Sequence, residues 1–292
     1  MKKKLKIIIN PFSGIGKKKV VPFLLEKILD KNLFEWDITY TEKAKHAIDI
    51  SADAVKDGYQ GVIAVGGDGS VNEIARSLIH TDVVLGIIPG GSGNGIARSL
   101  NIPIKTIRAI ENINQFYLEK IDTGLLDGHP FIGVAGLGFD ALISKEFAER
   151  RVRGKLGYGY VILKKMNAFK PMNVAIDGIS NMDSNDAIVV AFANTSQYGN
   201  NAFIAPTANP FDGQLKISLI EKLNLLQFAD ISQKMFRRKL LESKKVQFGE
   251  FNEITIKHGS KYAHIDGEPI EVPSEIVVKV VPLSLNVISP SR

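Results

Sequence analysis

The fold class is decided by one stretch of sequence, Val62–Ile63–Ala64–Val65–Gly66–Gly67–Asp68–Gly69–Ser70. Its first four residues are apolar and rich in β-branched side chains, which is typical of a strand buried on both faces. A glycine turn with one carboxylate, Asp68, follows the strand, and helical spacing then runs over Val71–Ile79. A buried strand, a turn and a helix in this order predict a parallel sheet with helices packed against it.

The same arrangement recurs within the first 126 residues, where strand-like runs occur at Leu5–Ile9, Trp36–Tyr40 and Val83–Ile88. Further glycine turns, Asn10–Gly14 and Pro89–Asn94, follow the first and the last of these runs. Because ligands bind beyond the carboxyl ends of the strands in an open parallel sheet, we expect all three turns at one edge. Glycine lets the backbone approach a ligand, and consecutive N–H groups ahead of a helix favour phosphate. The predicted helices are Val20–Leu29, Ala44–Val55 and Val71–Ile79.

After Tyr117 the pattern changes to a succession of strand-like runs punctuated by Asp–Gly turns, with two helical stretches, Phe139–Arg151 and Leu225–Leu241. This pattern predicts a mostly antiparallel β-sandwich. We therefore expect an α/β domain formed by residues 1–126 with the tail 283–292, followed by a β-sandwich domain over residues 127–282. The predicted strands that follow this change of pattern are Tyr117–Ile121, Phe131–Ala135, Asn173–Ile176, Ala187–Ala193, Leu215–Ile220, Glu253–Ile256, Ala263–Ile265 and Glu275–Val281.

The composition of the 292 residues excludes several kinds of site. There is no cysteine, so disulfides, thiolate zinc sites, iron–sulfur clusters and a cysteine nucleophile are excluded. The five histidines are scattered, which disfavours a histidine-built metal site. The net charge of +6 is spread along the chain, which disfavours a nucleic-acid face but suits anionic ligands and membrane surfaces. The apolar runs are too short to span a bilayer, and we expect a cytoplasmic protein.

Neither standard nucleotide fingerprint fits the chain. A P-loop around Gly14 would need glycine at Pro11 and serine or threonine at Lys18. The motif Gly136–Leu137–Gly138–Phe139–Asp140–Ala141 matches the dinucleotide pattern after a strand. However, the ribose-binding acid expected some twenty residues later is missing, since residues 152–175 contain no Asp or Glu.

Several motifs together are more specific than any glycine turn alone. They are Asn10–Pro11-x-Ser13–Gly14, Gly66–Glu73, Gly91–Asn94 through Ala97–Arg98, Gly136–Ala141, Pro206 through Asp212–Gly213-x-Leu215, and Asp266–Gly267–Glu268. In this order they resemble the diacylglycerol kinase catalytic-domain family, which includes bacterial lipid kinases and sphingosine kinases. The resemblance covers nearly the whole chain. It implies an NAD-kinase-like α/β domain followed by a β-sandwich domain, with ATP in the cleft between them.

The resemblance implies an enzyme that uses ATP and Mg²⁺. Its predicted activity is transfer of the γ-phosphoryl group to a lipid hydroxyl of the diacylglycerol or sphingosine type. The expected partner is a lipid substrate at a membrane surface that the protein contacts peripherally. A homodimer is left open, and nucleic acid is not expected as a partner.

Asp68 is the candidate general base, because phosphoryl transfer needs positioning, charge neutralisation and removal of one hydroxyl proton. Glu268 is the second candidate catalytic residue, and we expect it to hold Mg²⁺ together with Asp68. Asn209, Asp212 and Gln214 match a structural Mg²⁺ site of some bacterial members, although a simple turn explains them almost as well. The expected nucleotide contacts are Asn10, Pro11, Ser13, Gly14, Thr41, Gly66, Gly67, Gly69, Ser70, Asn72, Glu73, Gly91, Ser92, Gly93, Asn94 and Arg98.

The chain departs from the family pattern at two positions. Gly95 stands where many members have an Asp that helps to hold the metal, and Gly133 stands where many have Asn. Glycine or alanine at the first position resembles the sphingosine kinases. Two alternatives stay open, a soluble NAD-kinase-like phosphotransferase and a non-catalytic nucleotide or lipid sensor.

Two basic clusters allow two interpretations each. One comprises Arg150, Arg151, Arg153 and Lys155, and the other comprises Arg237–Arg238–Lys239 with Lys244–Lys245. Each is either a solvated, charged surface or a surface that meets anionic lipid headgroups.

Overall fold

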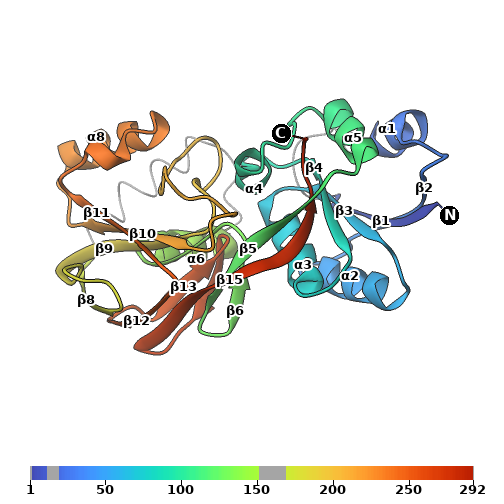
Figure 1. The fold of residues 1–292 in the computed structure, drawn as a ribbon. Helices are drawn as coiled ribbons and strands as arrows, with labels where there is room; N and C mark the ends of the chain where they lie inside the picture. The colour runs from blue at the N-terminus through green and yellow to red at the C-terminus, as the bar shows by residue number, and fades with distance from the viewer. Residues whose placement is uncertain (1, 12–19, 151–168, 292) are drawn as a thin grey trace. The chain divides into compact units, whose positions relative to one another are not determined.

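The computed structural model describes residues 2–11, 20–150 and 169–291, without the side chains of 145–150. The chain forms two compact units, which are drawn in Figure 1. Unit 1 comprises Met1–Thr123, Gly199–Asn201 and Pro282–Arg292, and unit 2 comprises Gly124–Tyr198 and Ala202–Val281. The short segment Gly199–Asn201 belongs to unit 1, although nothing in the sequence marks it.

Unit 1 is built on a parallel sheet, as the sequence predicts. Its strands β1 (Lys3–Ile9), β2 (Phe34–Tyr40), β3 (Gly61–Gly66) and β4 (Val84–Pro89) lie in the order β4-β3-β1-β2. The end of the long strand β15 (Glu275–Ile288) pairs in parallel with β4, so the C-terminal tail returns to this sheet as expected. Strands β3 and β4 are buried along their whole length, which explains their uniformly apolar sequences.

Helices cover both faces of this sheet. Helices α1 (Val21–Ile28) and α5 (Thr106–Gln115) lie on one face, and α2 (His46–Lys56) and α3 (Asp68–Leu78) lie on the other (Figure 1). Helix α5 and the short helix α4 (Gly95–Ser99) were not predicted from the sequence. Helix α4 has only five residues, too few to establish a helical repeat.

Unit 2 is mostly antiparallel, which confirms the predicted fold class. Strand β9 (Ser184–Ala193) pairs antiparallel with β7 (Val134–Gly138), β8 (Met172–Asp177) and β10 (Leu215–Glu221). Large apolar side chains such as Phe131, Phe192 and Leu215 fill the main core of the unit. The remaining strands are β5 (Leu118–Leu126), β6 (His129–Phe131), β11 (Val246–Phe251), β12 (Glu253–His258), β13 (Tyr262–Ile265) and β14 (Glu268–Glu271), and α6 spans Phe139–Arg150.

Two predicted elements of unit 2 have different bounds in the structure. The strand predicted over Phe131–Ala135 is two strands, because the N–H groups of residues 132–134 donate to a side chain instead of a neighbouring strand. The helix predicted over Leu225–Leu241 ends earlier, so α8 spans Leu225–Phe236. Arg238 then takes a φ of +58°, which interrupts the helix, and a 3₁₀ turn follows at Leu240–Glu242. The sequence analysis did not predict β11 and β14.

Candidate functional site

The turns that the sequence singles out lie at one edge of unit 1. Asn10, Thr41, Gly67 and Gly90 each follow directly after the carboxyl end of β1, β2, β3 or β4. The second and third glycine turns are joined by their backbones, because the Gly90 N–H donates to the carbonyl of Gly66 over 2.6 Å. The parallel strands therefore bring these turns together at the carboxyl-end edge, where an open sheet binds its ligands.

The second and third glycine turns pack directly against each other. A Cβ atom on Gly91 would lie 2.5 Å from the Cα of Gly67, and a Cβ on Gly67 would lie 3.1 Å from the Cα of Gly91. Both distances are shorter than a normal contact to a Cβ atom. Only glycine at these two positions lets the two backbones approach closely, which exposes main-chain groups to a ligand.

Asp68 is held by one of its two carboxylate oxygens. It is the first residue of α3, and its Oδ1 accepts the N–H of Ile96 in α4 over 3.0 Å. Its Oδ2 makes no hydrogen bond to the part of the chain that the structure describes. A Cβ on Gly93 would lie 3.0 Å from Oδ2, so the absence of a side chain there leaves room beside this oxygen. An oriented carboxylate with one accessible oxygen can accept a proton or bind a cation.

Asn94 shapes the third turn through its side-chain amide. The Oδ1 of Asn94 accepts the N–H of Gly91 and its Nδ2 donates to the carbonyl of Gly91, each over 2.9 Å. The residue is buried, and its φ of +50° is one that asparagine tolerates better than most residues. Its hydrogen-bonding groups therefore fix the turn, and its predicted contact with a nucleotide stays a prediction.

Arg98 and the segment Gly199–Asn201 hold the other side of the same turn. The Arg98 Nε donates to the carbonyl of Gly93 over 3.2 Å, and the N–H of Asn200 donates to the same carbonyl over 3.2 Å. The guanidinium also reaches the Oδ1 of Asn201, at 3.4 Å. The Arg98 side chain therefore supports the glycine turn, and its predicted contact with the nucleotide stays a prediction.

The other predicted contacts of unit 1 differ in accessibility. Asn10 donates from Nδ2 to the Ser70 hydroxyl over 3.0 Å, and Glu73 accepts the N–H of Lys45 over 3.1 Å. Asn72 is fully buried, which leaves its side chain no exposed surface for a ligand. Pro11, Gly69 and Ser92 are exposed, Thr41 is buried, and Ser13 and Gly14 lie outside the described residues.

In unit 2 the turn Asp266–Gly267 is fixed by the Asp266 carboxylate. The φ angles of the two residues are +50° and +89°, as in the tight turns that join antiparallel strands. The carboxylate accepts three backbone N–H groups, those of Ile132, Gly133 and Val134, over 2.8–2.9 Å. Asp266 therefore ties the β13–β14 turn to the start of β7, and we assign it a structural role.

A network of polar side chains supports the same turn. His264 Nδ1 lies 3.3 Å from the Gly267 nitrogen and accepts its N–H. Nε2 lies 3.0 Å from the Oδ2 of Asp140, which also accepts the Tyr198 hydroxyl over 2.9 Å. This chain of hydrogen bonds connects the first turn of α6 with the turn that precedes Glu268.

Glu268 is the first residue of β14, directly after this turn, and it pairs with Ile265 in the ladder between β13 and β14. It lies in unit 2, whereas Asp68 lies in unit 1. Among the described residues, no three acidic or histidine side chains gather closely enough to hold a metal ion by themselves. Carboxylates nevertheless suit Mg²⁺, which commonly takes one or two of them together with waters and substrate phosphates. Shared binding of Mg²⁺ by Asp68 and Glu268 stays a prediction.

Comparison with known families matches the two halves of the chain separately. The diacylglycerol kinase catalytic domain matches residues 4–126, and the YegS C-terminal NAD kinase beta sandwich-like domain matches residues 133–289. Together the two matches span the chain almost from end to end. The chain belongs to the diacylglycerol kinase catalytic-domain family.

Relatives in this family have similar lengths. A diacylglycerol kinase of Staphylococcus saprophyticus is 27% identical over 92% of this chain and 90% of its own length. A diacylglycerol kinase of Mycobacterium tuberculosis is 27% identical over 98% of this chain and 95% of its own. The crystal structure of a diacylglycerol kinase from Bacillus anthracis superposes with a TM-score of 0.72 at 21% identity, covering 98% of this chain and 97% of that one. The last likeness concerns the fold alone.

The structural Mg²⁺ site predicted at Asn209, Asp212 and Gln214 stays a prediction, and a lysine ammonium contacts two of these residues. The Asp212 carboxylate already has a cationic partner, because the Lys216 ammonium lies 3.1 Å from its Oδ2. The ammonium also lies 3.2 Å from Gln214 Oε1 and 2.9 Å from Glu250 Oε2. Burial lowers the pKa of Lys216, but its hydrogen bonds to Glu250 and Asp212 outweigh burial and raise the pKa above its ordinary value. Lysine therefore supplies the positive charge at this turn.

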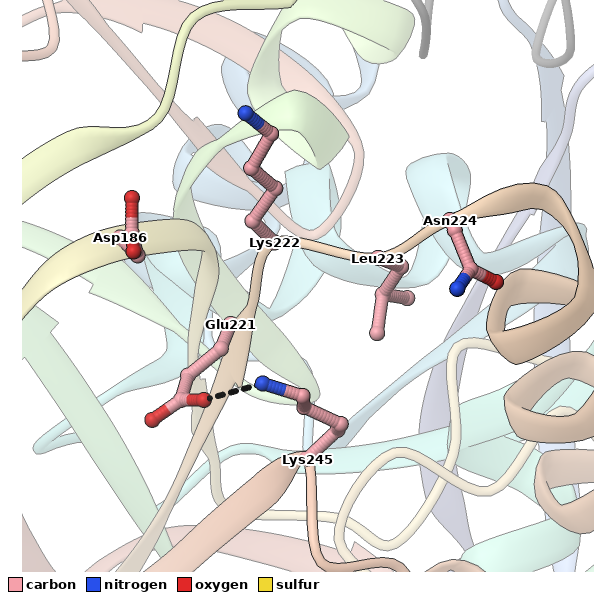
Figure 2. A pocket seen from close by; sticks show the side chains of 6 residues that line it. All are labelled: Asp186, Glu221, Lys222, Leu223, Asn224 and Lys245. Carbon is pink, nitrogen blue, oxygen red and sulfur yellow. Dashed lines mark hydrogen bonds and ion pairs between the residues drawn. The ribbon is translucent and has the colours of Figure 1, made fainter.

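Neither of two pockets found in unit 2 is lined by a predicted site residue. One has a volume of about 400 Å³ and is lined by charged side chains around the start of α8, as Figure 2 shows. There Lys245 pairs with Glu221 over 3.1 Å, so the two charges compensate each other. The second, of about 460 Å³, lies beside α6 and is lined by residues that include Leu142, Phe169 and Met172.

Two features around the site could not be identified from the sequence as functional. His264, Asp140 and Tyr198 are far apart in the chain, and only their hydrogen bonds show that they support one turn. The sequence signal for this set of residues was the position of Asp140 in a motif of the diacylglycerol kinase catalytic-domain family. The segment Gly199–Asn201 carries no recognisable pattern at all.

Proposed function

We propose that this member of the diacylglycerol kinase catalytic-domain family transfers the γ-phosphoryl group of ATP to the hydroxyl group of a diacylglycerol-like lipid. The observation that carries the proposal is the carboxylate of Asp68, with one oxygen held by Ile96 and the other accessible beside two packed glycine turns. The names of the relatives, diacylglycerol kinases that align over almost the full chain, support the substrate class.

The glycine turns and Asp68 have different tasks in the proposed reaction. The backbone groups of the turns around Gly67 and Gly91 would receive the phosphates of ATP. Asp68 would accept the hydroxyl proton of the lipid while the lipid oxygen bonds to the γ-phosphorus. The bond between that phosphorus and the bridging oxygen of ADP breaks, and the proton leaves Asp68 for water afterwards. The hydrogen bond from Ile96 would keep the carboxylate oriented for this step.

Asp68 and Glu268 are the residues that would hold Mg²⁺. When bound, the ion would neutralise negative charge on the transferring phosphates. Gly95 contributes no carboxylate, so this chain would rely on waters for the remaining ligands.

The first test replaces Asp68 with Asn and measures transfer of labelled phosphate from ATP to diacylglycerol. Because Asn has nearly the same shape but does not act as the base, we expect Asp68→Asn to lower kcat by roughly 10²–10⁴-fold. Binding of ATP should persist in calorimetry. Asp53→Asn, an exposed carboxylate on α2 paired with Lys56, is the matched control. Wild-type transfer by Asp68→Asn would show that Asp68 is not the base.

The second candidate function is a soluble NAD-kinase-like phosphotransferase, which the NAD-kinase-like character of the matched C-terminal domain favours. The same labelling experiment separates the two functions, because NAD and a lipid extract are offered to the enzyme in parallel. Label in NADP alone would contradict the lipid kinase. Tight binding of ATP without transfer to any acceptor would favour a sensor instead.

Contact with a membrane is the remaining part of the proposal. No helix within residues 2–11, 20–150 and 169–291 has the length and apolar character needed to cross a membrane. We propose that the enzyme reaches its lipid at the membrane surface, because a diacylglycerol-like substrate resides in the membrane. The basic cluster at Arg150–Lys155 lies outside the described side chains.

A further inference from the structure

Helix α8 of unit 2 presents an apolar stripe to solvent. The exposed fractions of Leu225, Leu226 and Phe236 are 59%, 83% and 59%, and Ala229 is exposed as well. Leu226 is the most exposed large hydrophobic residue of the described chain. Residues 225, 229 and 236 follow the helical repeat and lie on one side of the helix, with Leu226 next to them. This side of the 12-residue helix therefore has large apolar side chains at both ends, with Ala229 and the polar Ser232 between them.

The orientation of this stripe is fixed by the opposite side of the helix. Ile231 is buried in a core cluster of unit 2, and Phe228 and Met235 pack against the same cluster. The helix begins with a capping box, in which Asn224 and Gln227 exchange hydrogen bonds of 2.9 Å between side chain and backbone. A helix capped and anchored in this way keeps its outer face outward, so the exposure of the leucines does not come from fraying.

Positive charge is concentrated around the same helix. Residues 221–245 contain seven Lys/Arg and three Asp/Glu, which gives this stretch +4 of the whole chain's net charge of +6. Each of the three acids is already paired with a lysine, as in the ion pair between Asp230 and Lys234 at 2.7 Å. Within the described residues, no acid pairs with the remaining four cations, Lys222, Arg237, Arg238 and Lys244.

Two of these cations have a visible arrangement. In Figure 2 the Lys222 side chain points away from the ion pair of Glu221 and Lys245. The Arg238 guanidinium stacks over the Phe203 ring at 4.1 Å, which leaves its charge uncompensated. Leu241, with an exposed fraction of 50%, lies between Arg238 and Lys244 in the sequence and extends the apolar surface. The exposed Leu241 therefore lies among basic side chains beyond the end of α8.

We infer that α8 and the segment 237–245 form a docking surface for an anionic membrane. An amphipathic helix with Leu and Phe on its outer face and Lys/Arg around it is the type that lies in the lipid headgroup region. Two copies of the chain meeting through this surface would bring two patches of +4 together, so a homodimer contact here is disfavoured. The inference deepens the proposed function, since it rests on a substrate that resides in a membrane.

The test is sedimentation of the full chain with vesicles of phosphatidylcholine, with and without phosphatidylglycerol. We expect Leu226→Gln with Phe236→Gln to lower the partition into anionic vesicles by about tenfold, because two apolar anchors are lost. Arg237→Glu with Lys244→Glu should lower the partition by at least about tenfold, and added salt should weaken wild-type binding. Phe23→Gln on α1, where Phe23 has an exposed fraction of 65%, and Lys56→Glu are the matched controls and should bind as the wild type does.

The outcomes separate this inference from the proposed function. All variants should phosphorylate a short-chain diacylglycerol dissolved as monomers at the wild-type rate, because they do not touch the catalytic residues. If no lipid is phosphorylated while the α8 variants still lose vesicle binding, the proposed function fails and the docking surface stands. Wild-type vesicle binding by both α8 variants would overturn the docking surface. A wild-type dimer that Leu226→Gln with Phe236→Gln converts to a monomer, without any change in vesicle binding, would overturn it as well.

Discussion

At the scale of single residues, the contact between Gly67 and Gly91 makes a sharp prediction. A methyl group on residue 91 would lie 2.5 Å from the Cα of Gly67, so Gly91→Ala must push the two turns apart. We expect a loss of about 1–3 kcal/mol in the free energy of unfolding, as for other overpacked sites. We also expect weaker binding of ATP, measured by calorimetry. Gly69→Ala is the control for stability, since a Cβ there would meet no atom within 4 Å. Equal losses of stability in the two variants would refute the steric argument.

The types of residue in the site could be predicted from the sequence, but the hydrogen-bond partners of their polar atoms could not. The spacing of the turns placed Asp68, Gly67 and Gly91 at one edge because parallel strands end together. Asn94 was expected to contact the nucleotide, yet both groups of its amide bind the backbone of its own turn. Asp266 binds three N–H groups of a segment some 130 residues away. Such partners depend on the folded backbone, which local sequence spacing does not specify.

At the scale of elements, an ammonium group holds the turn before β10 to the start of β10, at the place where the sequence predicts a structural Mg²⁺ site. Lys216 lies between Asp212 and Glu250, and its side chain is only 8% exposed. We expect EDTA, without nucleotide, to leave the Tm of the wild type unchanged. Lys216→Met should lower the Tm by several degrees, because a loss of about 1–3 kcal/mol shifts Tm by about 2–4 °C per kcal/mol in a domain of this size. A Tm of the wild type that falls in EDTA would show that a metal stabilises the turn after all.

The bounds of elements were predictable wherever the sheet itself determines them. Strands such as β3 and β4 are buried on both faces, so burial alone fixes their composition. The break between β6 and β7 was not predictable, because the side chain that causes it, Asp266, lies far away in the sequence. Helix α8 ends at Phe236, although the sequence pattern predicts a helix as far as Leu241, since Arg238 takes a left-handed conformation that the pattern does not indicate.

At the scale of the whole molecule, unit 1 is assembled from three separate parts of the chain. The last of these, Pro282–Arg292, carries none of the predicted site residues, yet its strand pairs with β4, whose end carries the third glycine turn. Leu285, Val287 and Ile288 in this part are fully buried. Asn286 donates from Nδ2 to the carbonyl of Thr81 over 2.9 Å. The site therefore depends on residues about 190 positions away from the turn that they support.

Truncation of the chain after Val281 tests this dependence. Removing three fully buried aliphatic side chains costs about 2–5 kcal/mol each, which together is comparable to the stability of a typical domain. We expect unit 1 to unfold and ATP binding to be lost, while unit 2 keeps its own core. Limited proteolysis followed by mass spectrometry would then show cleavage throughout residues 1–123 and protection of residues 170–281. Truncation after Ser289, which removes Pro290, Ser291 and Arg292 and retains β15, is the control and should bind ATP as the full chain does. Retention of ATP binding by the shorter chain would show that β4 keeps its glycine turn in place without β15.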